Sequence, residues 1–330
     1  MIYNDFHYER LDLEKSKHLI NEVISDFKNA KSADKQIEAI KKVDNFSRDY
    51  MTYQAMASLN FSRNINDVDA KAEKDYYDSI SPDMTELYDK FDKVLHESKF
   101  KQNIIDEYGN TFLNQIEISL KTFDSKIKNL LKREIELKND YTKLTAGAKI
   151  NFEGKDYNLA GLGPFHSDTN RDIRKKSYEA RYHWFKDNEQ DLDDIYDKLV
   201  KLRHKIAVTL GYENFINLGY DRMGRSDYGP EQVSNFRKQI VEQVVPIVSK
   251  LHEQKKDILG LDKLYFYDGI NFKDGDPKPK GTPHELINAA QEMYHELSPE
   301  TGEFFDKMVN EELMDLVNRD GKRPGGFCTS

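Results

Sequence analysis

The chain has 330 residues and a formal net charge of −9, with 38% hydrophobic and 33% charged residues. The negative balance excludes a general nucleic-acid binder, whose affinity depends on neutralising phosphates with lysine and arginine. The 19 tyrosines and 18 phenylalanines exclude a disordered chain, because such chains lack the apolar surface that offsets the entropy of ordering.

The sequence also indicates a compartment. No apolar run approaches the roughly 20 residues that would cross a bilayer. The opening residues 1–6 have neither a basic nor an apolar leader, and the single cysteine, Cys328, excludes an internal disulfide framework. We therefore expect a cytoplasmic protein with no nucleic-acid and no membrane partner.

Apolar residues spaced by three and four predict amphipathic helices in the first half of the chain. The expected helices cover about 11–27, 34–62, 66–99, 110–122 and 124–147. Short polar breaks, for example at 31–34 and 79–83, predict links between helices. Long helices on short links favour antiparallel packing, so the sequence predicts a mainly α protein.

A β-hairpin and two further helices are expected next. Ile150 and Phe152 alternate with polar residues before Gly154, and the alternation resumes afterwards, which predicts a small hairpin near 149–159. Ser167-Asp168 predicts the N-cap of a helix over 169–187. A helix over 189–210 then ends near a glycine.

Prolines mark two later helix starts. Pro230 and Pro283 each suit the first helical position. The helix from Pro230 carries a long apolar stripe, which predicts a central place in the core, and Pro246 predicts a kink in it. A helix over 299–319 also has apolar residues that need a packing partner.

No zinc-binding motif can be read from the histidines. A His-Glu-x-x-His helix presents two imidazoles to one zinc ion, with the glutamate acting on the metal-bound water. His-Glu pairs begin at His96, His252, His284 and His295, and the residues four further on are Phe100, Lys256, Asn288 and Pro299. The nearest approach is His284 to Asn288, yet Glu285 is better explained as a favourable acidic residue in a first helical turn. We expect no metal ligand and no catalytic residue among these 330 residues.

Two aromatic-rich segments leave two interpretations open. They contain Tyr178, Tyr182, His183, Trp184 and Phe185 in one case and residues 264–268 in the other. These side chains could line a groove that grips an extended peptide, or they could be core residues with satisfied polar tips.

Several stretches, taken in order, resemble one family. They are LTAGAKINF at 144–152, LGPF at 162–165, RKKSYEA at 174–180, AVTLGYENF at 207–215, YDRMGR at 220–225, YHELSPETGEFF at 294–305 and GGFCT at 325–329. Together they resemble the zinc metallopeptidases of the oligoendopeptidase F and thimet-oligopeptidase type, in their short bacterial form. The resemblance covers essentially the whole chain.

The resemblance implies a two-lobed, nearly all-helical fold around a channel, in which zinc-activated water hydrolyses short peptides. It implies a helical lobe at 1–165 and the first part of the catalytic domain at 166–330. Gly325, Gly326 and Phe327 match a stretch shortly before the metal-binding helix and become candidate substrate-cleft residues. Zinc is expected in the full-length enzyme, and this chain is expected to be an amino-terminal portion that is inactive and metal-free by itself.

The alternative is a non-catalytic, all-α protein that binds peptides or acts as a scaffold. A reading frame that continues past Ser330 into His-Glu-x-x-His would favour the peptidase. A stop codon there would favour the alternative.

Overall fold

A computed structural model describes residues 3–326 and 328 of the chain. Most of it is helical. The elements run η1 Tyr3–Asp5, α1 Leu13–Asn29, α2 Ala33–Arg63, α3 Val68–His96, α4 Lys101–Tyr108, α5 Asn110–Thr122, η2 Ser125–Ile127, α6 Lys128–Ala146, β1 Ile150–Phe152, β2 Lys155–Tyr157, α7 Gly163–His166, α8 Arg171–Asp187, α9 Glu189–Thr209, α10 Phe215–Arg222, α11 Pro230–Gln239, η3 Ile240–Val244, α12 Val245–Leu259, α13 Pro283–Leu297 and α14 Pro299–Asn310. The strands pair antiparallel, with Ile150 opposite Tyr157. The mainly α class and the small hairpin are thus confirmed.

Helices α1 to α5 form a bundle with its own hydrophobic core. Side-chain caps begin its three long helices: Asp12 and Asp67 each accept from two backbone N–H groups of the first turn, and Ser32 accepts from one. Phe27, Tyr77 and other apolar residues of α1, α2, α3, α4 and α5 are buried against one another. The spacing of three and four along each helix therefore marks the faces that meet inside the bundle.

The predicted break at 79–83 is wrong, because α3 continues through Pro82. A proline inside a helix removes one backbone bond and costs about 3 kcal/mol. Ile80 and Met84, which flank it, are buried with Pro82 in the bundle. Tertiary packing on both sides thus outweighs the local cost.

Two smaller cores continue the chain beyond the bundle. One joins α6, α9 and α10 around Ile127, Ile206 and Leu218. The other packs the β-hairpin against α8, with Phe152 and Leu162 buried at its centre. The N-cap of helix α8 is Asn170, whose side chain accepts from two backbone N–H groups, so the cap predicted at Ser167-Asp168 is two residues too early.

A buried carboxylate ties these helices together. Glu134 on α6 receives Arg203 on α9 at 2.8 Å and Arg222 on α10 at 3.0 Å. Burial opposes ionisation of Glu134, but the two guanidinium groups outweigh it and lower its pKa. The carboxylate is therefore charged at neutral pH and links three helices.

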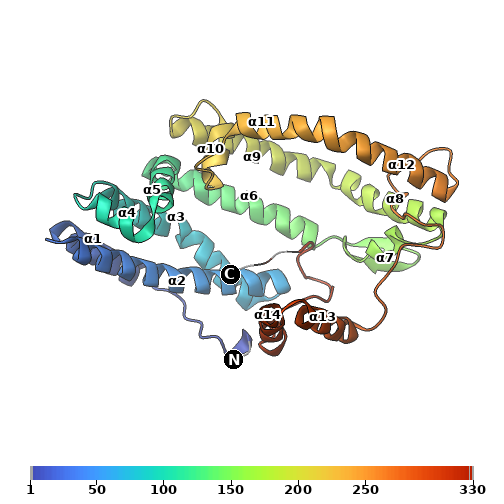
Figure 1. The fold of residues 1–330 in the computed structure, drawn as a ribbon, viewed down its shortest axis with the longest axis horizontal. Helices are drawn as coiled ribbons and strands as arrows, with labels where there is room; N and C mark the ends of the chain where they lie inside the picture. The colour runs from blue at the N-terminus through green and yellow to red at the C-terminus, as the bar shows by residue number, and fades with distance from the viewer. Residues whose placement is uncertain (1–2, 327, 329–330) are drawn as a thin grey trace.

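The helix that starts at Pro230 contradicts the expected central place in the core. Figure 1 shows α11 and α12 as one long rod along the top of the molecule, beside α8 and α9. None of its residues is buried, and Phe236, Val241 and Ile247 are largely exposed. Just before Pro246 the rod contains the π-helical turn η3, the kind of local distortion that occurs inside longer helices.

Helices α13 and α14 form a hairpin on the opposite side of the molecule (Figure 1). Helix α14 ends at Asn310, so the helix predicted over 299–319 is too long, and 311–326 has no helix or strand. Gly302 lies so close to the His295 ring that a Cβ atom there would come within 2.4 Å of it. Within the part of the chain that the structure describes, no helix is long and apolar enough to span a membrane.

Candidate functional site

The predicted cleft residues lie at the end of the segment that follows α14. Gly325 and Gly326 are exposed, and Gly325 has a positive φ of 92° that favours glycine. Phe327 lies outside the described residues. Among the described residues, no heavy atom lies within 4 Å of a Cβ atom built on either glycine, so their role in a cleft stays a prediction.

The segment before these glycines is fastened to the end of α2. The Ile65 N–H donates to the Gly321 carbonyl, and the Arg323 N–H donates to the Ser62 carbonyl, both at 2.9 Å. Gly321 has a φ of 75°, and a Cβ atom there would lie 2.7 Å from Asn66. This segment therefore passes in close contact with the amino-terminal bundle before it reaches Gly325.

Asp315 holds the same segment through charge. Its carboxylate receives Arg63 at 3.1 Å, Arg319 at 2.7 Å and Lys322 at 2.9 Å. Hydrogen bonds from Arg319 and Lys322 hold the pKa of Asp315 well below its usual range, although partial burial opposes the shift. The place of Gly325 is thus set by an ionic cluster as well as by backbone bonds.

The two His-Glu pairs of α13 contribute to a helix start and to an ion pair. Thr282 and Glu285 form a capping box at the start of α13, in which the Thr282 N–H donates to Glu285 at 2.6 Å. The Asn288 amide lies 3.3 Å from the His284 ring. His295 lies 3.0 Å from both carboxylate oxygens of Asp306. The interpretation of Glu285 as a first-turn residue is confirmed.

The described residues do not fit a zinc site. Zinc takes three or four His, Cys or carboxylate ligands that converge on one point. Among residues 3–326 and 328, no three such side chains are grouped so that they could hold a metal ion. His295 is paired with a single carboxylate, that of Asp306.

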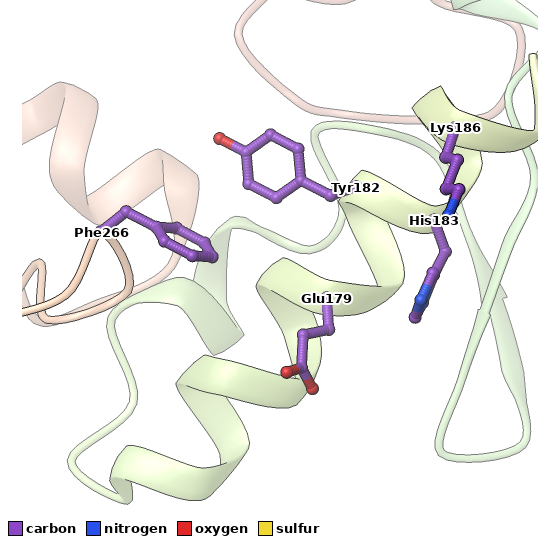
Figure 2. A pocket seen from close by; sticks show the side chains of 5 residues that line it. All are labelled: Glu179, Tyr182, His183, Lys186 and Phe266. Carbon is purple, nitrogen blue, oxygen red and sulfur yellow. The ribbon is translucent and has the colours of Figure 1, made fainter. Parts of the chain in front are cut away.

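An open pocket of about 360 Å³ lies beside α8, and Figure 2 shows its lining. Four of its side chains come from α8 and the fifth from the loop 260–282: Glu179, Tyr182, His183, Lys186 and Phe266. The structure thereby divides the aromatic residues whose role the sequence left open. Trp184 and Phe185 pack on the hairpin core, whereas Tyr182 and Phe266 face solvent.

Sequence reasoning did not single out Glu179 and Lys186. The signal that could have found them is their spacing with Tyr182 and His183, because positions separated by three, four and seven residues share a helix face. That face of α8 carries the charged side chains of Glu179 and Lys186 together with the ring of Tyr182. Such a combination is typical of an open binding surface and not of a face buried in a core.

A second open pocket, of about 690 Å³, lies on the α13–α14 hairpin. It is lined by Asn288, Gln291, Glu292, His295, Glu296 and Asp306. Gln291 and His295 both bond to Asp306, which lowers the pKa of that carboxyl. Its central polar groups therefore already bond to one another.

Comparison with known families assigns the fold described above to a class of protein. Residues 3–123 match the Peptidase M3 N-terminal domain, and residues 165–330 match Peptidase family M3. The chain therefore belongs to peptidase family M3. No curated protein matches it.

Solved structures give the same result in three dimensions. PZ peptidase A with an inhibitor is 40% identical, with a TM-score of 0.97 over 99% of this chain and 58% of its own. A structure provisionally assigned as oligoendopeptidase F is 39% identical, with a TM-score of 0.97. The match covers 100% of this chain and 58% of that one. A third structure, provisionally assigned as oligoendopeptidase F from Bacillus anthracis, is 37% identical, with a TM-score of 0.96. The match covers 100% of this chain and 61% of that one. The chain thus spans about three fifths of the length of these relatives.

Proposed function

We propose that this chain forms part of a zinc-dependent endopeptidase that cleaves short peptides. The observation that carries the proposal is the match of residues 165–330 to Peptidase family M3. The likeness over the whole chain to a structure of PZ peptidase A with an inhibitor supports it. In the complete enzyme, the zinc ion would activate the water that attacks the peptide bond.

The zinc ligands are proposed to lie outside these 330 residues. No His-Glu-x-x-His occurs in the sequence, and the described histidines do not converge on a common point. We therefore expect the chain alone to bind no stoichiometric zinc and to cleave nothing. Its own contribution would be to fold, to bind peptide and to bring Gly325, Gly326 and Phe327 to the cleft.

The proposed division of the chain is a helical lobe at 1–165 and the first part of the catalytic domain at 166–330. The separate matches at 3–123 and 165–330 support this boundary. We also propose a cytoplasmic location, with short peptides as partners and neither nucleic acid nor membrane. The net charge of −9 and the single cysteine support these assignments.

The test compares the 330-residue chain with a fusion. The fusion adds the part of the PZ peptidase A chain that the match leaves out. Metal content and cleavage of a quenched fluorescent oligopeptide are measured for both proteins. We expect the fusion to bind one zinc per chain and to cleave in a chelator-sensitive manner, while the 330-residue chain does neither.

Two outcomes would contradict this proposal. Stoichiometric zinc with chelator-sensitive cleavage in the 330-residue chain would place the metal site within it. A folded fusion that binds peptide without cleaving it would favour the non-catalytic peptide-binding or scaffold protein. The pocket beside α8 is the observation that keeps this second candidate in view.

A further inference from the structure

The pocket beside α8 presents an exposed aromatic corner. The rings of Tyr182 and Phe266 meet edge to face, with centroids 5.4 Å apart and planes at 86°. Their exposed fractions are 53% and 60%. The Tyr178 ring contacts both of these rings. The His166 ring stacks on Tyr178, with ring centroids 3.9 Å apart. Two large rings thus remain open to solvent although neighbouring rings support them from behind.

The loop that carries Phe266 is fixed by a buried ionic cluster. The Asp268 side chain is 0% exposed and receives Arg171 at 2.8 Å and Arg174 at 3.3 Å. The Tyr265 N–H donates to the same carboxylate at 2.9 Å. The guanidinium groups and the backbone donor lower the pKa of Asp268 against the effect of burial, so it stays charged.

This cluster has a consequence for binding. Arg174 also donates to the carbonyl of Tyr267, the residue next to Phe266, at 3.1 Å. The backbone on either side of the exposed ring is therefore fixed before any ligand arrives. A ring that is already ordered lowers the entropy cost of binding an apolar side chain.

Glu179 and Lys186 carry opposite charges, and the side chains of both line the pocket (Figure 2). Glu179 and Lys186 are seven residues apart on α8, which places them on one face about 10.5 Å apart along the axis. An extended tripeptide, at about 3.3–3.6 Å per residue, spans a similar length. His183 lies one turn before Lys186 and adds a second donor at that end.

Glu179 forms a weak ion pair whose lysine partner can be replaced by a ligand. Its carboxylate lies 3.8 Å from the Lys175 amine, and both side chains are about half exposed. Such exposed pairs contribute about 0.5 kcal/mol or less, so a ligand ammonium can replace the lysine. Within the described part of the chain, Lys186 has no ion pair within 4.0 Å.

We propose that this pocket binds a short peptide by its two free ends and a central apolar side chain. The ammonium group lies at Glu179, the side chain lies in the corner of Tyr182 and Phe266, and the carboxylate lies at His183 and Lys186. The choice of a peptide as ligand rests on the peptidase function proposed above. Binding here needs no metal and no bond cleavage, so it is a separate property of the α8 face.

The experiment is isothermal titration calorimetry of the 330-residue chain with Ala-Phe-Ala in the presence of a chelator. The same tripeptide is then used with an acetylated amino end, with an amidated carboxyl end and with both. We expect the doubly capped peptide to bind at least about tenfold more weakly than the free one, because each lost charge pair reduces affinity. The chelator removes any contribution from a metal centre, so failure here leaves the zinc-peptidase test untouched.

Variants then assign each end of the peptide. Lys186→Gln should weaken the free tripeptide several-fold and leave the amidated one unchanged. Glu179→Gln should weaken the free tripeptide several-fold and leave the acetylated one unchanged. Phe266→Leu should weaken all four peptides, whereas Tyr196→Ala, on an exposed tyrosine of α9, is the matched control and should change nothing.

The proposal fails if the capped and free peptides bind equally well. It also fails if Lys186→Gln weakens the acid and the amide to the same extent, because the lysine would then not be facing the carboxylate. Absence of measurable heat with the wild-type chain, confirmed by unchanged NMR spectra of the tripeptide, would overturn it directly. Both charge variants alter exposed side chains, so their folding is not at stake.

Discussion

The amino-terminal bundle and the helices α11 to α14 carry the same kind of amphipathic pattern but use it differently. In α1 to α5, the apolar faces lie against one another and bury residues such as Phe27 and Tyr77. In the rod formed by α11 and α12, residues of the same type stay exposed, and in α13 and α14 only Gly302 is buried. Periodicity therefore identifies the face of a helix that prefers burial. It does not identify the element that covers it.

The largest test of this difference is a pair of phenylalanine truncations. Phe27→Ala removes a ring that is 1% exposed and packs edge to face on Phe91. It should lower the free energy of unfolding by about 3–5 kcal/mol. Phe236→Ala, where the ring is 62% exposed, should change it by about 0.5 kcal/mol or less. Urea unfolding followed by circular dichroism measures both, and an equal loss would show that the rod is covered in solution.

A second test uses two carboxyl groups whose pKa values move in opposite directions. Burial raises the pKa of Asp92 in the bundle to about 6; a hydrogen bond with Ser119 opposes the shift, and the charge of Asp89 adds to it. Between about pH 4 and 6 the folded state holds more protons than the unfolded state, so this group lowers stability as pH rises. Asp92→Asn should raise the free energy of unfolding at pH 7 by about 1–2 kcal/mol and flatten that part of the profile.

Asp306 on α14 is the matched control for this profile. Hydrogen bonds with Gln291 and His295 lower its pKa, so its contribution is present at neutral pH and is lost on acidification. Asp306→Asn should therefore destabilise at pH 7 and not at low pH. Unfolding curves at a series of pH values measure both variants. The comparison breaks if the two asparagine variants shift stability in the same direction at pH 7.

The smallest expected effect on stability comes from the exposed rod. Val241 and Val245 lie one turn apart at the π-helical turn and are exposed. A contiguous apolar patch of this kind favours self-association, which sedimentation velocity should show as a concentration-dependent shift. The double variant Val241→Lys/Val245→Lys should suppress that shift and change the free energy of unfolding by less than about 0.5 kcal/mol. A wild-type chain that stays monomeric at every concentration would contradict the prediction.

The sequence predicted the local structure of the bundle well, because its helices have side-chain caps and regular apolar spacing. The helix expected at 110–122 is present as α5 within the same bounds. Pro82 misled the prediction, since its local cost is outweighed by packing that only the three-dimensional structure reveals. Helix α4 was not predicted, because eight residues offer too few turns for a clear period.

The candidate site was predictable only in part. Pro283 marks a helix start, so the sequence correctly predicted Glu285 in a first helical turn, whereas the capping box with Thr282 was found only in the structure. The pocket beside α8 depends on Phe266 meeting Tyr182 across more than 80 residues, and no local pattern encodes that contact. Residues 178–185 therefore contain both core and exposed rings, and only the fold divides them.

The attachment of Asp315 to the end of α2 has a consequence for how the chain folds. Arg63 and its carboxylate partner are 252 positions apart. At a translation rate of roughly 5–20 residues per second, the partner leaves the ribosome about 13–50 s after the arginine. The five-helix bundle consists mostly of near-neighbour contacts and can assemble within that interval, since such topologies fold in milliseconds or less. The contact between Asp315 and the end of α2 would then form last. Hydrogen-exchange protection at the end of α2 would develop after that of every other part of the bundle.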